Sequence, residues 1–332
     1  MNKRRFFMLL GLVAFAIIVY ANVDRVGEFS GYLHQARWYI LLLIVVAQLV
    51  GYYCMARFYQ LFLSIFGPRQ PLKKFYSMSL AMNFVNQAFP SGGVSSLSYL
   101  AAQVPEVPNG KITLTHFMRY LFTYISFTVI LLVGFVILML TGNVAAITSR
   151  FTLLVVLAII AISIAGLTVL SNEAWLKGVL NWARVPINQF GRRILRRRHE
   201  LVSEQQLSGF VGEFHEGYSI IRSGPQYWRK PLAYLFINNL TELATIYVVF
   251  LSFGQWVNPG IVIAGYALAN VVSVLGVFTG GVGIFEATMI ATFTALGVPL
   301  ALATAVVIVY RVLNLAIFLP VGFVFYNKSL KS

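Results

Sequence analysis

Six long apolar runs constrain this chain more than any other feature of its sequence. A helix of ~20 apolar residues rises about 30 Å, which matches the hydrocarbon core of a bilayer. Only 11% of the residues are charged and 59% are apolar, which excludes a soluble globular domain, a disordered chain and a disulfide-rich secreted protein. The sequence therefore predicts an all-α, polytopic helical membrane protein. The predicted membrane-spanning helices are Phe6–Ala21, Trp38–Phe66, Phe117–Leu140, Phe151–Leu170, Leu232–Phe253 and Leu300–Tyr326.

Two further apolar stretches, Phe75–Gln103 and Ile261–Leu296, are interrupted by glycine clusters. The basic N-terminus is expected in the cytoplasm, because Lys and Arg gather on the cytoplasmic side of spans. A signal peptide ending at Val19–Ala21 is the alternative for this segment. If Phe75–Gln103 crossed once, residues 171–230 with their ten Lys and Arg would lie outside, against that rule. We therefore predict that Phe75–Gln103 is re-entrant, that Ile261–Leu296 is re-entrant or forms two short spans, and that both termini are cytoplasmic.

The two interrupted stretches are related by an offset of 188 residues, which separates Gly92-Gly93-Val94 from Gly280-Gly281-Val282. The same offset relates three further pairs, namely Pro71 and Pro259, Leu80-Ala81 and Leu268-Ala269, and Val133–Val136 and Val321–Val324. Because crossing parity orients the two units oppositely, we predict an inverted-topology repeat of six full spans and two re-entrant or broken-helix elements. Within a single membrane domain, the predicted parts are a first span and external loop at 1–37, repeat 1 at 38–140, a connecting span at 141–170, a basic cytoplasmic segment at 171–230 and repeat 2 at 231–326.

The apolar runs contain several charged residues. Burying one unpaired at the bilayer centre costs at least ~2.5–3.5 kcal/mol of free energy, so we expect these residues to be paired or functional. Arg311 lies near the middle of its span and Glu286 follows the second glycine cluster, so we expect the two to pair. Arg119 and Arg57 lie nearer span ends and can instead extend towards the membrane surface. Glu242 shares its span with two asparagines, which form a polar seam or join helices.

Broken helices at membrane depth expose backbone N–H groups, which are tolerated only inside protein or beside a wet cavity. Helix N-termini favour anions, and paired broken helices near the midplane indicate a transport site. The alternative is that the glycines serve only close helix packing. The candidate substrate-binding residues are Ser91, Gly92, Gly93, Arg119, Glu242, Gly280, Gly281, Gly283, Glu286, Arg311 and Asn314.

Three motifs carry a resemblance to a known family. Residues 278–286 (FTGGVGIFE) resemble the PGGxGxFE motif of flippase-like membrane proteins, with Thr279 in place of proline. Tyr310–Leu313, followed by Pro320, resembles that family's YR…P signature, and Asn86–Gly93 its N…P…GG element. Over nearly its whole length the chain is similar to the lysylphosphatidylglycerol synthase transmembrane region, a family that also covers the MprF flippase domain and YbhN-like proteins.

The resemblance implies an inner-membrane, flippase-like transporter that moves a phospholipid or a lipid-linked anionic headgroup between leaflets. Lysyl-lipid synthesis is not expected, because little chain follows the last span. Two alternatives remain, a small-solute secondary transporter and a non-transporting membrane partner of lipid or envelope synthesis enzymes. We expect no enzyme activity, no cofactor and no metal site, because the sequence has no P-loop, no nucleophile elbow and only four scattered histidines.

The basic segment 171–230 mixes its Lys and Arg with aromatic residues such as Trp175 and Trp182. This mixture predicts an interfacial helix on anionic membrane lipids, or a simple determinant of topology. Nucleic acid is not an expected partner, since no nucleic-acid-binding module accompanies the charge. Homo-oligomerisation is left open by the sequence.

Overall fold

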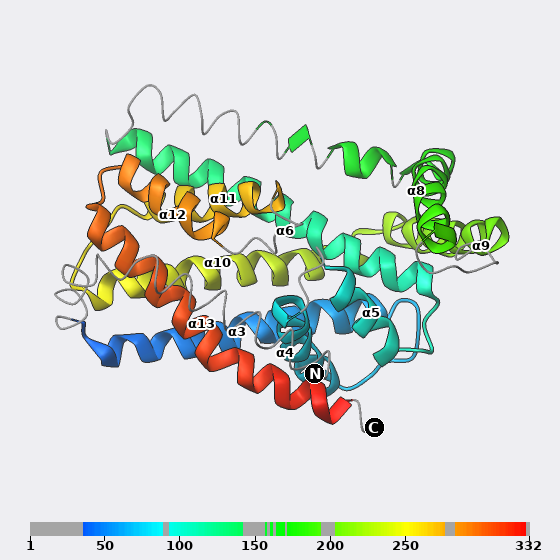
Figure 1. Cartoon of the computed structure of the whole chain (residues 1–332), viewed down its shortest axis with the longest axis horizontal. Coiled ribbons are helices and arrows are strands. Elements are labelled where there is room, and N and C mark those ends of the chain that lie inside the picture. Colours follow the sequence, from blue (N-terminus) through cyan, green and yellow to red (C-terminus); the bar gives the residue numbers. More distant parts are fainter. Residues whose placement is uncertain are drawn as a thin grey trace.

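The computed structural model describes residues 36–88, 93–141, 157, 160–161, 164–169, 171–193, 203–275 and 283–329. Within these ranges the regular elements are all helical (Figure 1). In chain order they are α3 (Trp38–Leu63), α4 (Leu72–Ala88), α5 (Val94–Gln103), α6 (Asn109–Leu140), α8 (Glu173–Arg193), α9 (Glu204–Arg222), η2 (Pro225–Tyr227), α10 (Arg229–Ser252), α11 (Pro259–Leu275), α12 (Ile284–Ala295) and α13 (Leu300–Ser329).

The prediction of an all-α polytopic membrane protein is confirmed. Four helical segments are long and apolar enough to cross a bilayer, and they correspond to α3, α6, α10 with the preceding η2, and α13. Each coincides with a predicted span. The predicted span Phe6–Ala21 lies outside the described residues, as does most of Phe151–Leu170.

The described helices form two units with the same order of elements. In each unit a long helix is followed by a 17-residue helix, a short helix and a second long helix: α3, α4, α5 and α6, then α10, α11, α12 and α13. Corresponding helices run in opposite directions along the bundle (Figure 1). The backbone N–H of Arg37, before α3, donates to the Ser252 carbonyl at the end of α10 at 2.7 Å, so these two helices are antiparallel. The predicted inverted-topology repeat is therefore present.

In each unit, the two shorter helices form a hairpin. The start of its first helix and the end of its second helix lie at the same end of the bundle. The Gln70 side chain, before α4, donates to Glu106, after α5, at 3.0 Å, so this pair closes on itself. The pair α11 and α12 begins and returns at the opposite end (Figure 1). The 12 residues of α12 rise only about 18 Å, too little to cross a bilayer core. The shortness of α12 favours the re-entrant arrangement of Ile261–Leu296 over two short spans.

In each unit, the first of the two shorter helices packs against the last long helix of the other unit. α3 packs along α10, while α4 packs on α13 of the other unit and α11 packs on α6. Glycines related by the 188-residue offset stand at both crossings. A Cβ atom at Gly322 would lie 2.5 Å from the Leu80 carbonyl oxygen, and one at Gly134 would lie 2.6 Å from Ile263 Cγ2. The repeated glycine is therefore required because two helices approach closely there.

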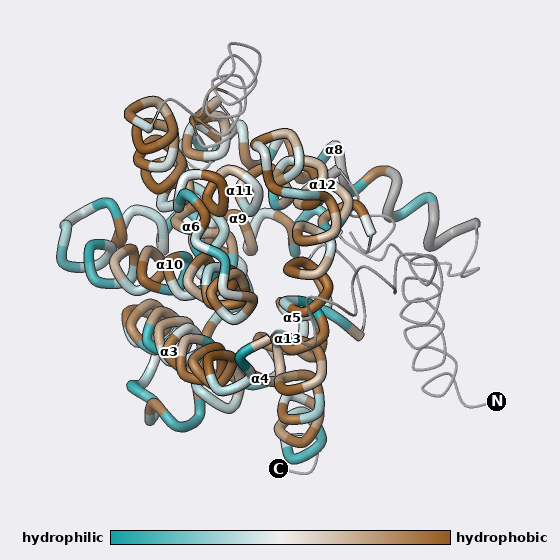
Figure 2. The backbone as a smooth tube through the Cα atoms, turned by 90° about the vertical axis from the view of Figure 1, so that its left-hand side faces the viewer, coloured by the Kyte–Doolittle hydropathy of each residue, from teal (hydrophilic) through white to brown (hydrophobic). Residues whose placement is uncertain are grey.

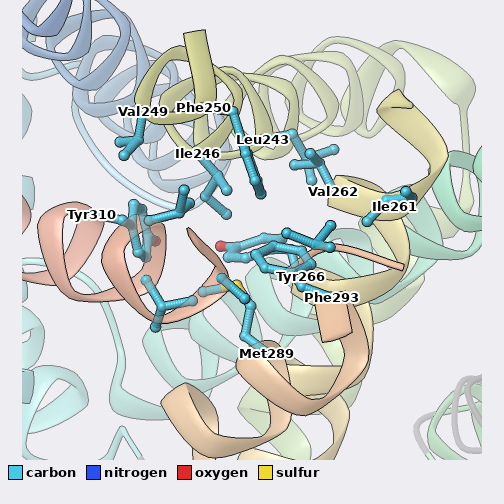
Figure 3. Packing of buried hydrophobic residues seen from close by; sticks show 14 of the residues in the cluster. Leu243, Ile246, Val249, Phe250, Ile261, Val262, Tyr266, Met289, Phe293 and Tyr310 are labelled. Carbon is cyan, nitrogen blue, oxygen red and sulfur yellow. The ribbon is translucent and has the colours of Figure 1, made fainter. Parts of the chain in front are cut away.

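Two large apolar clusters fill the bundle, and each draws residues from both units. In the second unit, side chains from all four helices converge (Figure 3), and those labelled there are Leu243, Ile246, Val249, Phe250, Ile261, Val262, Tyr266, Met289, Phe293 and Tyr310. The other core is built mainly from α3 to α6 and is covered by α9.

One end of the bundle carries most of the described basic residues, and we call it the basic end. It comprises the 64–71, 104–108 and 223–228 connections with the helix ends that they join, the C-terminal end of α13, and α8 and α9. The Gly110 amide at the start of α6 donates to Glu213 of α9 at 2.9 Å, and Lys111 pairs with Glu216 at 3.0 Å. Seen along the bundle, α8 lies across the long helices rather than parallel to them (Figure 2).

Candidate functional site

A cavity of about 410 Å³ lies between the two units. Helices α3, α4, α6, α10, α11, α12 and α13 all contribute to its wall. Its lining is unusually polar for apolar helices, with eight side-chain amides: Gln48, Asn83, Asn86, Gln87, Asn238, Asn239, Asn270 and Asn314. Tyrosines supply most of the aromatic surface: Tyr52, Tyr59, Tyr120, Tyr124, Tyr266 and Tyr310. Polar groups are costly inside apolar helices, so their concentration here indicates a site.

The structure brings five of the candidate residues together. Four line the cavity, and a fifth joins them through an ion pair: Arg119, Glu242, Arg311 and Asn314, with Glu286. Two glycines, Gly93 and Gly283, begin the short helices α5 and α12 and do not line the cavity. The remaining candidates lie outside the described residues: Ser91, Gly92, Gly280 and Gly281.

The expected pair between Arg311 and Glu286 is formed. Arg311 Nε lies 2.5 Å from Glu286 Oε1, and the guanidinium carbon lies 4.3 Å from the centre of the Phe285 ring. The second carboxylate oxygen of Glu286 accepts the Gly283 backbone N–H at 2.7 Å. Glu286 thus neutralises Arg311 and occupies the N-terminus of α12 with its own negative charge.

Glycine is required where each short helix begins. Gly283 has a φ of 88° and Gly93 a φ of 94°, a region that glycine adopts without a steric penalty. A Cβ atom at Gly93 would also overlap the Tyr120 hydroxyl. The structural partner of Gly93 is thus Gly283, two residues later than the gapless offset of 188 places it. The sequence alignment of the two glycine clusters was wrong by these two residues.

Glu242 joins the two units at the level of the Arg311 pair. Its carboxylate accepts the Tyr310 hydroxyl at 3.1 Å and the Gln48 amide at 3.3 Å. Gln48 also donates to the Thr245 hydroxyl at 3.2 Å. These bonds link α10 and α13 of one unit to α3 of the other, so the polar seam expected around Glu242 crosses the boundary between units.

Arg119 lies on another part of the wall, where the Tyr59 hydroxyl is its hydrogen-bonding neighbour. Its Nε atom is buried and has no hydrogen-bond partner within the described part of the chain. The guanidinium carbon lies 5.1 Å from the centre of the Tyr120 ring. Arg119 therefore faces the cavity instead of extending to the membrane surface. Arg57 does not line the cavity, and it bonds to Gln60 at 2.7 Å and to the Tyr234 hydroxyl at 3.4 Å.

Sequence reasoning missed much of the lining, including Gln48, Tyr310 and the amides of α4. The search for charges inside apolar runs would have found them if side-chain amides had been counted as well. In the described residues, no three His, Cys, Asp or Glu side chains gather as they would around a metal ion. The cavity can therefore offer hydrogen bonds, aromatic surface and two arginines to a ligand.

Comparison with known proteins agrees with the fold and the motifs. A family model described as the lysylphosphatidylglycerol synthase TM region matches residues 7–322. A UPF0104 membrane protein of Methanothermobacter thermautotrophicus is 30% identical over 184 residues, which cover 51% of this chain and 52% of that protein. The match thus spans about half the length of this relative. Since the family model covers nearly the whole chain, the protein belongs to the lysylphosphatidylglycerol synthase TM region family of membrane proteins.

Proposed function

We propose that this protein moves a phospholipid, or another lipid-linked anionic headgroup, between the two leaflets of a membrane. The observation that carries the proposal is the polar cavity between two inverted units. A polar headgroup cannot cross the apolar core unassisted, because stripping its water without replacement is costly. Amides, hydroxyls and arginines in the wall can replace that water. The acyl chains then stay in the bilayer while the headgroup passes through the protein.

The two pairs of short helices support a transport mechanism. α4 and α5 approach from the basic end, and α11 and α12 from the other (Figure 1). In transporters with inverted repeats, movement of one unit against the other opens a fixed site to each side in turn. Here the exchanged contacts of α4 with α13 and of α11 with α6 couple the two units. Such coupling lets one side open as the other closes.

The basic end is the proposed cytoplasmic side of an inner membrane, with both termini in the cytoplasm. On α8, Trp175 is 60% exposed and Trp182 is 78% exposed, seven residues apart on one face. Leu176 on another face is buried. A helix that lies across the bundle with exposed tryptophans beside basic residues suits the surface of an anionic leaflet. No catalytic step is part of this proposal.

Translocation of labelled phospholipid in proteoliposomes tests the proposal, using phosphatidylglycerol and phosphatidylethanolamine with and without a proton gradient. The wild type should move at least one lipid faster than empty vesicles. Asn314→Trp fills the cavity and should abolish the movement. The matched control Val324→Trp lies on the same helix with a half-exposed side chain and should retain it. If no lipid moves in wild-type vesicles, the flippase proposal fails, and a small-solute transporter or a non-transporting partner takes its place.

A further inference from the structure

The two arginines of the cavity differ in whether a carboxylate of the protein neutralises them. Arg311 is neutralised by Glu286, and its side chain also rests on Phe285. Within the described residues no carboxylate pairs with Arg119, and its neighbours are the neutral Tyr59 hydroxyl and the Tyr120 ring. A cation buried without an anion is unfavourable, so such residues in membrane proteins usually serve a ligand or a partner.

Arg119 is also too far from Glu242 to form an ion pair with it. The Tyr59 hydroxyl lies 3.2 Å from His116 Nδ1, one turn before Arg119 on α6. The Gln48 amide, on the same helix α3, bonds to Glu242. Tyr59 and Gln48 are eleven residues apart on α3, which separates their levels by roughly 16 Å. Arg119 therefore lies at another depth of the cavity, nearer the basic end at which α6 begins.

The second unit has a carboxylate at the start of its short helix, and the first unit has none at the corresponding position. In α12 the third residue, Glu286, holds a carboxylate against the arginine of α13. In α5 the third residue is Ser96, which donates to the Gly93 carbonyl at 2.9 Å and carries no charge. The first turn of α5 packs against α6 beside Arg119, since Ser96 Oγ lies 3.5 Å from His116. Among the described residues of the first unit, no carboxylate takes this place beside Arg119.

We infer that Arg119, and not Arg311, binds the phosphate of the transported headgroup. The ligand class is a phosphate mono- or diester, whose oxygens accept charge-assisted hydrogen bonds from the guanidinium. Ser79 of α4 lines the same cavity with a buried hydroxyl that has no partner among the described residues, and it can donate a further bond. The phosphate takes at Arg119 the role that the Glu286 carboxylate takes at Arg311. This inference rests on the proposed function and assigns its anion to one half of the protein.

Binding to the purified full chain in detergent tests the inference apart from transport. The probes are dihexanoyl phosphatidylglycerol, glycerol 3-phosphate and inorganic phosphate, measured by calorimetry. Arg119→Gln should weaken binding of the lipid probe about tenfold or more, as expected for loss of charge-assisted hydrogen bonds. Arg119→Lys should weaken it less, because the charge remains while the planar donor pair is lost. Arg57→Gln, an arginine outside the cavity, is the matched control and should bind as the wild type does.

The remaining outcomes separate this inference from the proposed function. The double variant Glu286→Gln with Arg311→Gln removes the internal pair without leaving a charge behind, and it should lose less affinity than Arg119→Gln. Equal binding by Arg119→Gln and wild type, with both folded by size exclusion, overturns the inference, as does a wild type that binds none of the probes. Arg119-dependent binding without lipid movement keeps the phosphate site and discards the flippase. Binding of the two water-soluble probes alone makes the ligand a free phosphate ester.

Discussion

The starts of α5 and α12 are built alike in the backbone and differently in charge. Both helices follow a glycine with positive φ, and both lie in a pair that returns to its own end of the bundle. At α12 the carboxylate of Glu286 bonds the Gly283 N–H and pairs with Arg311. At α5 the corresponding Ser96 donates to the Gly93 carbonyl, lies 3.5 Å from His116 and carries no charge. The second unit holds its arginine in an ion pair, whereas no described carboxylate pairs with Arg119 in the first.

This difference shows how an inverted repeat can provide one site instead of two. Glycines at the helix starts and at the helix crossings are needed in both units, because they determine the backbone geometry. The charged residues are not bound by that requirement. One unit can therefore hold its arginine in a fixed ion pair, while the other offers its arginine to a ligand.

The largest expected effect concerns the geometry that the two units share. Gly322→Ala places a methyl group against the Leu80 backbone carbonyl, which cannot rotate away, so α4 and α13 must separate. We expect a loss of about 3 kcal/mol in the free energy of unfolding, measured in mixed detergent micelles. Gly134→Ala meets the Ile263 side chain and should cost about half as much, because a side chain adjusts more easily than backbone.

Gly212→Ala on α9 is the control for both glycine variants, since nothing lies within 4 Å of its added Cβ atom. It should stabilise the protein by about 0.5–1 kcal/mol through helix propensity. Equal losses in Gly322→Ala and Gly134→Ala would mean that the two crossings adapt alike. The backbone symmetry would then be closer than the structure indicates.

The next effect concerns the internal pair of the second unit. Glu286→Gln leaves Arg311 without its anion, and breaking a fully buried pair costs about 3–5 kcal/mol. The Arg311 side chain is 32% exposed, so solvent screening reduces the expected loss to about 2 kcal/mol. Adding Arg311→Gln should restore about half of it, as the unpaired charge is removed. If the double variant is no more stable than Glu286→Gln alone, the charge of Arg311 has another partner.

The sequence alone predicted a large part of this arrangement. Crossing parity and the positive-inside rule predicted that Phe75–Gln103 is re-entrant and that Ile261–Leu296 is re-entrant or forms two short spans, because both arguments depend only on chain order and charge. The pair of Arg311 and Glu286 was also expected, since both residues are charged and lie deep in apolar runs. Glycines at the helix crossings matched because close helix packing leaves a direct mark on the sequence.

The environment of Arg119 could not be predicted in the same way. An arginine near a span end reaches the membrane surface or an interior cavity, and its neighbours in space decide which. Here those neighbours include Tyr59, eleven residues beyond Gln48 on another helix. The cavity tyrosines were missed for the same reason, since a tyrosine in an apolar run is compatible with core, interface or site. Only the packing of α3 against α6 and α10 separates these cases.

The smallest expected effect is the stability change on removing Arg119, and its sign tests the comparison most directly. If Arg119 is an uncompensated buried cation, Arg119→Gln should raise the free energy of unfolding of the ligand-free protein by about 1 kcal/mol or less, because desolvation of the charge slightly outweighs its contact with Tyr120. Unfolding in lipid-free mixed micelles measures this. A fall of about 2 kcal/mol would reveal an anionic partner for Arg119 within the protein. Both cavity arginines would then be held by anions of the protein, and Arg119 would have no free charge for a headgroup.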